Sequence, residues 1–220
     1  MHAIEGAAAR SGAPSGLRER KKRRTRDTLI RSALELFARK GYERTTVDEI
    51  AEAAEVSQRT FFRYFANKEE VALAMQTVVD GLFLATLRSR PAAEAPLPAL
   101  RGAVLGTWDG ARAVIEAVVP LELHLCTYRL IESTPQLLAA RLRSLSEVEE
   151  LLALEIARRE GLDPRTDPRP HVLVAAFAGV MRVTTRAWGE RGEGGLDDLR
   201  ELTVAYLDQL GPALAENWRA

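Results

Sequence analysis

The sequence has little of the chemistry on which redox enzymes and disulfide-stabilised proteins depend. Cys126 is the one cysteine among 220 residues, and there are only three histidines. A single cysteine excludes an intramolecular disulfide and fits a reducing compartment. Because Cys126 lies among Leu123, Leu125 and Tyr128, we expect its thiol to be buried as a small hydrophobe. A redox sensor and a ligand contact are the alternatives.

Long apolar runs are also missing. The best run, at 174–181, is far shorter than the ~18 residues that a membrane-spanning helix needs. Residues 1–16 have no apolar core of a secretory signal, and their Ala, Gly and Ser content favours a disordered leader. We therefore expect a cytoplasmic protein that does not associate with membranes.

Catalytic signatures are absent as well. The sequence has no His-Glu-x-x-His, no Cys-x-x-Cys, no Gly-x-Ser-x-Gly and no P-loop. Its histidines are His2, His124 and His171, and the paired carboxylates at 149–150 and 197–198 fall on expected helix surfaces or starts. The sequence therefore predicts no enzyme, no cofactor and no metal site.

The net charge of zero conceals an uneven distribution. Residues 17–68 carry 14 basic and 8 acidic side chains, a net charge of +6, whereas residues 69–220 carry 16 basic and 22 acidic side chains, a net charge of −6. A basic N-terminal quarter on an acidic body indicates a local surface for a polyanion.

Apolar residues recur at helical spacing throughout the chain, and no segment alternates as a strand does. We expect an all-α fold of about nine helices. The expected domains are a leader at 1–16, a helix-turn-helix domain with a basic arm at 17–67, and a helical ligand-binding and dimerisation domain at 68–220. The expected helices are 18–40 (or 25–40), 47–54, 58–64, 68–89, 98–118, 120–132, 136–160, 170–189 and 195–217.

Three helix starts follow one another within 22 residues, which is a strong local pattern. Thr46 with Glu49 makes a capping box, and Ser57 and Asn67 can cap the next two helices. Gly41 can end the first helix in a left-handed conformation. Short capped helices packed through Ile50, Ala51, Phe61 and their apolar neighbours are typical of a helix-turn-helix, which places its second helix in the major groove.

The polar residues of this unit are of the types that bind DNA. Glutamine pairs with adenine and arginine with guanine in the major groove, and hydroxyl or ammonium groups bind phosphate oxygens. The expected DNA-binding residues are Arg23, Arg24, Thr45, Thr46, Ser57, Gln58, Arg59, Thr60, Arg63, Tyr64 and Lys68. The basic run 18–26, which includes the first two, is open to two interpretations: a solvated helix extension, or an arm on the phosphates or in the minor groove.

Residues 25–73 resemble the DNA-binding domain of TetR-family regulators. The family pattern is present as Ile50-Ala51, Ala54, Val56-Ser57, residues 61–65 and Lys68-Glu69. Two residues depart from it. Glu55 stands where the family usually has glycine in a turn of positive φ, and Phe62 stands where it usually has a phosphate-binding tyrosine. We therefore expect a turn at Glu55 that is either strained or slightly remodelled, and a packing role for Phe62.

Residues 98–210 are similar to a TetR subgroup that includes mycofactocin-type regulators. The similar stretches are 128–135, 160–164 and Ala187-Trp188. The resemblance implies a repressor that binds a palindromic or pseudo-palindromic operator in double-stranded DNA as a homodimer and is released by a small apolar ligand. Acyl-CoA thioesters and lipophilic drugs are the ligands that it suggests. A regulator that responds to a protein partner, or to no ligand, is the alternative.

By the same resemblance, the last two long helices form the dimer interface. Stripes of small and apolar residues on them fit this role, with packing inside one chain as the alternative. The expected interface residues are Val172, Ala175, Ala176, Gly179, Val183, Leu199, Leu202, Tyr206 and Leu210. The expected pocket residues are Trp108, Leu121, His124, Leu125, Tyr128, Phe177 and Met181, although His124 and the aromatic residues can equally be core.

Overall fold

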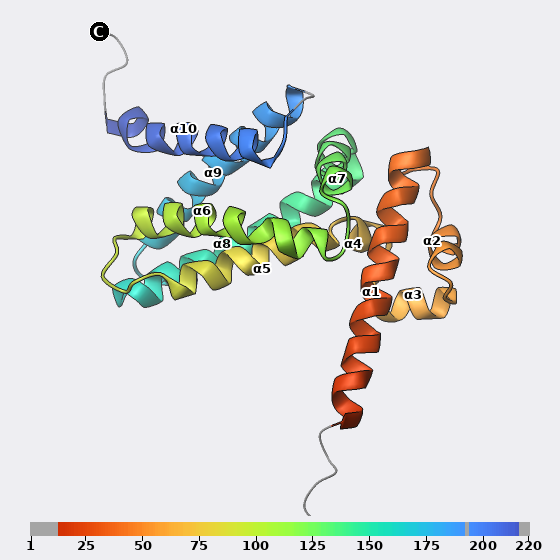
Figure 1. Cartoon of the computed structure of the whole chain (residues 1–220). Coiled ribbons are helices and arrows are strands. Elements are labelled where there is room, and N and C mark those ends of the chain that lie inside the picture. The colour runs from red at the N-terminus through yellow and green to blue at the C-terminus, as the bar shows by residue number, and fades with distance from the viewer. Residues whose placement is uncertain (1–12, 192–193, 216–220) are drawn as a thin grey trace, which may run out of the picture.

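The computed structural model describes residues 13–191 and 194–215, and every regular element within them is a helix (Figure 1). The all-α prediction is confirmed. The elements are α1 (Ala13–Lys40), α2 (Val47–Ala53), α3 (Gln58–Tyr64), α4 (Lys68–Ala72), α5 (Ala74–Ser89), α6 (Pro96–Glu116), α7 (Leu121–Ser133), α8 (Pro135–Glu160), α9 (Arg169–Glu190) and α10 (Leu196–Ala215). None of these helices is long and apolar enough to cross a membrane.

The described chain has ten helices because the expected helix 68–89 is interrupted at Leu73. This residue has φ −90° and ψ 0°, and it separates α4 from α5. No glycine or proline marks the interruption. The six residues 71–76 are all buried, so packing on every side of this segment determines its path. The expectation of one continuous helix was therefore wrong.

The predicted caps of α2, α3 and α4 and the predicted stop after α1 are confirmed, because they depend on residues close in sequence. Thr46 and Glu49 form both halves of a capping box, and the side chains of Ser57 and Asn67 cap α3 and α4. Gly41 follows α1 with φ 85°. These short-range contacts fix where the small helices begin, and therefore which side chains α3 presents.

The N-terminal helices and the larger helical body share one apolar core. Buried residues of α1, α3 and α4, including Phe37, Phe61 and Val71, belong to the same cluster as Ile115 of α6 and Ile131 of α7. Helix α7 packs against α1, and α4 packs against α8. The predicted boundary at 67/68 is thus a joint inside a continuous core.

Two expectations about the surface need correction. Cys126 is exposed, because α7 turns Leu125 and Thr127 inward and leaves the thiol on its outer side. Helix α1 begins at Ala13, so the last four residues of the predicted leader are helical. The rest of that leader, residues 1–12, lies outside the described residues.

Candidate DNA interface and internal cavity

Helix α3 has one buried face and one solvent face. Phe61 is completely buried, and Phe65, which ends the helix, is 2% exposed. The opposite face presents Gln58, Arg59 and Arg63, all exposed. Arg59 and Arg63 are four positions apart and follow one another along the helix, and Gln58 lies next to Arg59 at the start of the same solvent side.

Phe62 belongs to this solvent face. Its side chain is 50% exposed, and its ring meets that of Phe61 edge-on at 5.4 Å. The expectation that Phe62 serves packing was wrong, because the position follows Gln58 by four residues and Arg59 by three. An exposed aromatic ring therefore stands between the polar groups of α3.

The turn before α3 is strained, which is one of the two outcomes that the sequence leaves open. Glu55 has φ 54° and is the one non-glycine residue with positive φ in the described chain. The Val56 amide donates to the Ala51 carbonyl at 2.9 Å, which closes the turn. A left-handed non-glycine residue costs about 1–2 kcal/mol, which the packed core around the turn offsets.

The hydroxyl groups at the start of α3 are engaged with each other. Ser57 Oγ accepts from the Thr60 amide at 3.2 Å and lies 3.0 Å from Thr60 Oγ1. Tyr64, at the other end of the helix, is half-buried beneath the guanidinium of Arg63, which lies 5.2 Å from its ring centroid. Ser57 stays exposed, so capping and a contact with DNA are compatible.

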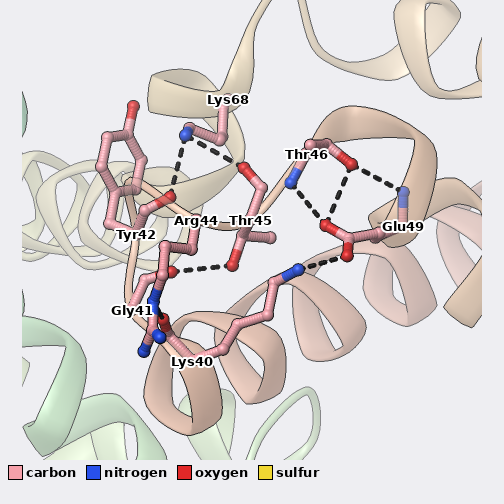
Figure 2. A network of polar contacts seen from close by, with 8 residues as sticks. All are labelled: Lys40, Gly41, Tyr42, Arg44, Thr45, Thr46, Glu49 and Lys68. Carbon is pink, nitrogen blue, oxygen red and sulfur yellow. Dashed lines mark hydrogen bonds and ion pairs between the residues drawn. The ribbon is translucent and has the colours of Figure 1, made fainter.

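Lys68 ties α4 to the loop between α1 and α2, as Figure 2 shows. Its ammonium donates to the Tyr42 carbonyl at 2.8 Å and the Thr45 carbonyl at 3.0 Å, and it lies 4.0 Å from the centroid of the Tyr42 ring. The Lys68 ammonium, which the sequence predicts to bind a phosphate, is therefore engaged by groups of the protein itself. Thr45 is a clear correction: it is 1% exposed and its hydroxyl donates inward to the Gly41 carbonyl.

Thr46 stays at the surface while it caps α2 (Figure 2). Its amide donates to Glu49 Oε2 at 2.8 Å, and its hydroxyl lies 3.0 Å from the same oxygen. The hydrogen bond from Lys40, followed by those from Thr46, lowers the pKa of the Glu49 carboxyl to about 2. The Glu49 carboxylate of the capping box therefore stays ionised in neutral solution.

The basic run occupies the N-terminal half of α1, which extends past the other helices in Figure 1. Arg23 and Arg24 are exposed, as are the basic residues from Arg18 to Lys22. Arg26 differs, because its guanidinium lies 5.4 Å from the ring centroid of Phe65 and is half-buried. The arm is therefore a helical extension of α1 that contacts the end of α3 through Arg26.

A cavity of about 190 Å³ lies between α5, α6, α7, α8 and α9. Five of the seven predicted pocket residues line it: Trp108, His124, Tyr128, Phe177 and Met181. Leu121 and Leu125 do not. Leu125 is buried instead in a separate cluster with Trp188 and Leu196, and Leu121 packs against it.

Apart from His124 and Tyr128, the polar residues of this cavity were not predicted from the sequence. Gln76 is fully buried in the cavity lining, and Arg141 makes a bidentate ion pair with Asp80. Gln76 and its neighbour Thr77 interrupt an otherwise apolar run at 71–79, and a long amide side chain in such a run was the available signal. The Asp80–Arg141 pair joins positions 61 residues apart, so spacing gave no signal for it.

His124 also lines the cavity, and it is 1% exposed. Burial lowers its pKa to about 4, because the charged imidazolium loses its hydration. Its ring meets that of Tyr128 edge-on at 5.1 Å. The imidazole is therefore neutral at physiological pH.

The predicted interface residues fall into two groups. On α9, Val172 and Val183 are 65% and 51% exposed, and Ala175 is exposed as well. On α10, Leu199 is 2% exposed and Leu202 9%, because both pack beside Trp188 within their own chain. Leu210 is also buried, so these three leucines are corrections: their stripe faces the chain's own core. Ala176, Gly179 and Tyr206 are half-buried.

Comparisons with known proteins cover both parts of the chain. Residues 29–75 match the family of bacterial regulatory proteins called the tetR family, and residues 94–215 match the MftR C-terminal domain. The regulator TcmR of Streptomyces glaucescens is 51% identical over 211 residues, which are 93% of this chain and 90% of that protein. The putative mycofactocin biosynthesis regulator MftR of Mycobacterium tuberculosis is 28% identical, over 82% of this chain and 83% of its own.

Solved structures agree with the sequence comparison. FadR of Thermus thermophilus, a TetR-family repressor crystallised with lauroyl-CoA, is 26% identical, with a TM-score of 0.53. The match covers 89% of this chain and 98% of FadR. The shared fold extends through the DNA-binding helices and the larger helical body.

Proposed function

This chain belongs to the TetR family of DNA-binding transcriptional regulators, and from that premise we propose that it is a repressor which binds a two-fold symmetric operator as a homodimer. A ligand that occupies the cavity releases the repressor from the operator. The single observation that carries the proposal is the solvent face of α3. There, Gln58, Arg59 and Arg63 are exposed side by side, and each has the hydrogen-bonding geometry to read a base edge.

We assign the other DNA contacts around this face. Thr46, Ser57 and Tyr64 are placed at the ends of the helix-turn-helix, where phosphates flank the groove, and Thr60 supports Ser57. The exposed ring of Phe62 contributes an apolar contact to a thymine methyl group. Arg23, Arg24 and the rest of the basic arm follow the backbone beyond the core site.

Dimerisation uses the exposed stripe of α9. Val172 and Val183 are eleven residues apart, which is about three helical turns, so they share one face with Ala175 and Gly179. Two α3 helices placed about 34–36 Å apart by the dimer would read two half-sites one turn apart. Substitution of both valines by aspartate should give a monomer in sedimentation velocity, whereas Val114→Asp, at an exposed position of α6, should remain dimeric.

The cavity is the proposed effector site. Its aromatic and aliphatic lining favours an apolar molecule, and FadR provides the precedent of a related repressor crystallised with an acyl thioester. Nothing in the proposal requires turnover, so we assign binding and no catalysis, in the cytoplasm where the chromosome lies.

The proposed route from the cavity to the DNA runs through α4. Gln76 lines the cavity and lies three residues after the interruption at Leu73. Lys68 lies five residues before Leu73 and binds the loop that precedes α2. A ligand that moves Gln76 would tilt α4 and carry the helix-turn-helix with it. The ligand need only bind this tilted form more tightly to shift the equilibrium.

Selection of bound sequences from a random DNA library tests the proposal. The expected result is a palindromic or pseudo-palindromic site that Arg59→Ala loses and Arg143→Ala, an exposed substitution on α8, retains. Recovery of sites without symmetry would refute the dimeric reader. Operator affinity that no cavity-binding molecule changes would instead refute release and leave control by a protein partner.

A further inference from the structure

Three polar atoms in the cavity lining have no hydrogen-bond partner among the residues that the structure describes. They are both atoms of the Gln76 side-chain amide and Nδ1 of His124. Gln76 is 0% exposed and His124 1%. A buried polar group without a partner costs about 1–3 kcal/mol, so apolar residues of similar shape would stabilise the ligand-free fold better. Their presence at a cavity indicates that a ligand supplies the partners.

The charges around the cavity balance. Three carboxylates and three guanidinium groups belong to its lining: Asp80, Glu132, Glu149, Arg141, Arg182 and Arg186. Arg141 is held by Asp80, and Arg182 is held by Glu149. The remaining two, Glu132 and Arg186, are of opposite sign. This lining has no surplus cation for a carboxylate or a phosphate, so burial of an anionic ligand would be costly.

The shape of the cavity favours flat rings over a long chain. Phe83 and Phe177 stack with 5.9 Å between ring centroids, and Trp108 and Tyr128 add two further aromatic surfaces. The volume of about 190 Å³ is little more than the ~150 Å³ of a cavity that holds benzene. A ring system of modest size fits, whereas a long acyl chain would require the helices to separate.

We infer that the cavity takes a neutral, flat, ring-shaped molecule that carries a hydrogen-bond donor beside an acceptor, such as a lactam or a hydroxyl next to a carbonyl. This inference rests on the proposed effector site and specifies its chemistry. The Gln76 amide pairs with both groups of the ligand, in the way that glutamine pairs with the edge of adenine. His124 makes a third hydrogen bond through Nδ1, as donor or acceptor according to its tautomer.

Two probes that differ by one group test the donor–acceptor edge. They are 2-quinolinone, which has N–H beside C=O, and coumarin, in which a ring oxygen replaces the N–H. The full-length protein should bind 2-quinolinone about 10- to 100-fold more tightly, because coumarin leaves the Gln76 carbonyl unpaired. In Gln76→Met this ratio should fall at least tenfold. Val114→Ala, which changes an exposed residue of α6 outside the cavity lining, should keep it.

Anionic probes test the neutrality of the ligand. Both 2-naphthoate and lauroyl-CoA should bind the wild-type protein at least ~10-fold more weakly than 2-quinolinone. Gln76→Met should also melt at a higher temperature than wild type when no probe is present, which shows that the variant is folded. If Gln76→Met does not fold, Gln76→Leu takes its place in the same comparison.

Calorimetric titration without DNA keeps this inference separate from the proposed function. An unchanged preference in Gln76→Met, tighter binding of either anion, or binding of none of the probes would overturn the inference. If 2-quinolinone binds as expected but operator affinity does not change, ligand release is wrong and the ligand chemistry stands.

Discussion

Replacement of Lys68 by methionine distinguishes a strut inside the protein from a contact with DNA. Methionine keeps the apolar stem and removes the ammonium group, which donates to the Tyr42 and Thr45 carbonyls at 2.8 and 3.0 Å and lies over the Tyr42 ring. Hydrogen bonds that involve a charged group contribute about 1.5–3 kcal/mol each. Lys68 is half-buried and water replaces part of these contacts, so we expect a loss of about 2–3 kcal/mol in all.

Two measurements separate the alternatives. A loss of this size lowers the melting temperature by about 4–12 °C in a protein of this length, which circular dichroism detects. If Lys68 is a strut, the slope of log affinity against log salt concentration should stay at its wild-type value. A phosphate contact would instead reduce that slope by about 0.9 for each half-site, or about 1.8 for a dimer, and leave the melting temperature unchanged.

Lys22→Met is the matched control, because Lys22 lies exposed on the basic arm. It should show the opposite pattern: a reduced salt slope and an unchanged melting temperature. A Lys68→Met protein that melts within about 2 °C of wild type and has a reduced slope would refute the strut and restore the phosphate contact that the sequence predicts.

Three further predictions follow from the arm, the cavity and the recognition helix. Glutamine at every basic position from Arg20 to Arg24 should weaken binding to all sequences and reduce the salt slope by about 0.9 per lost phosphate contact; an unchanged slope in fluorescence anisotropy would remove the arm from the DNA. His124 has a folded-state pKa of about 4 against 6.5 for the exposed imidazole, so the unfolded state binds more protons between these values and stability falls as pH drops from about 6.5 to 4. Between pH 8 and pH 5 the wild type should lose about 2 kcal/mol more than His124→Leu in urea unfolding, and equal losses would contradict the assignment. Deoxyuridine in place of thymine at the sensitive operator position should weaken wild-type binding about 3- to 10-fold and leave Phe62→Ala unaffected; equal effects on both proteins would refute the methyl contact.

The sequence predicts the local features of the DNA-binding unit well, because they depend on near neighbours. The caps at Thr46, Ser57 and Asn67 and the positive φ of Glu55 all involve residues within about five positions of one another. Phe62 was missed although the spacing was available, because residue type was given more weight than its position beside Gln58 and Arg59. The residue type that relatives have at this position does not determine whether Phe62 is exposed, whereas the helix periodicity of this chain does.

Contacts between distant segments could not be predicted in this way. Lys68 is bound by carbonyls 23 and 26 residues away, and nothing near it distinguishes an internal strut from a phosphate ligand. The leucines of α10 show a similar limit. Their spacing predicts a buried stripe correctly, but periodicity does not say whether the covering surface belongs to the same chain or to a second one. Here, Leu199 and Leu202 are covered by Trp188 and its neighbours.

Gln76 and Lys68 lie on opposite sides of Leu73, and this placement gives the proposed control a definite thermodynamic form. Gln76 loses hydrogen bonds when the cavity has no matching ligand, and Lys68 fixes the helix-turn-helix to α4. If ligand and operator each favour a different tilt of α4, each weakens the binding of the other by the same factor, because the coupling free energy is reciprocal. This explains why the oxygen and the nitrogen of the buried Gln76 amide are both unpaired. Their cost destabilises the ligand-free fold, so a ligand needs to supply less free energy to move the joint at Leu73.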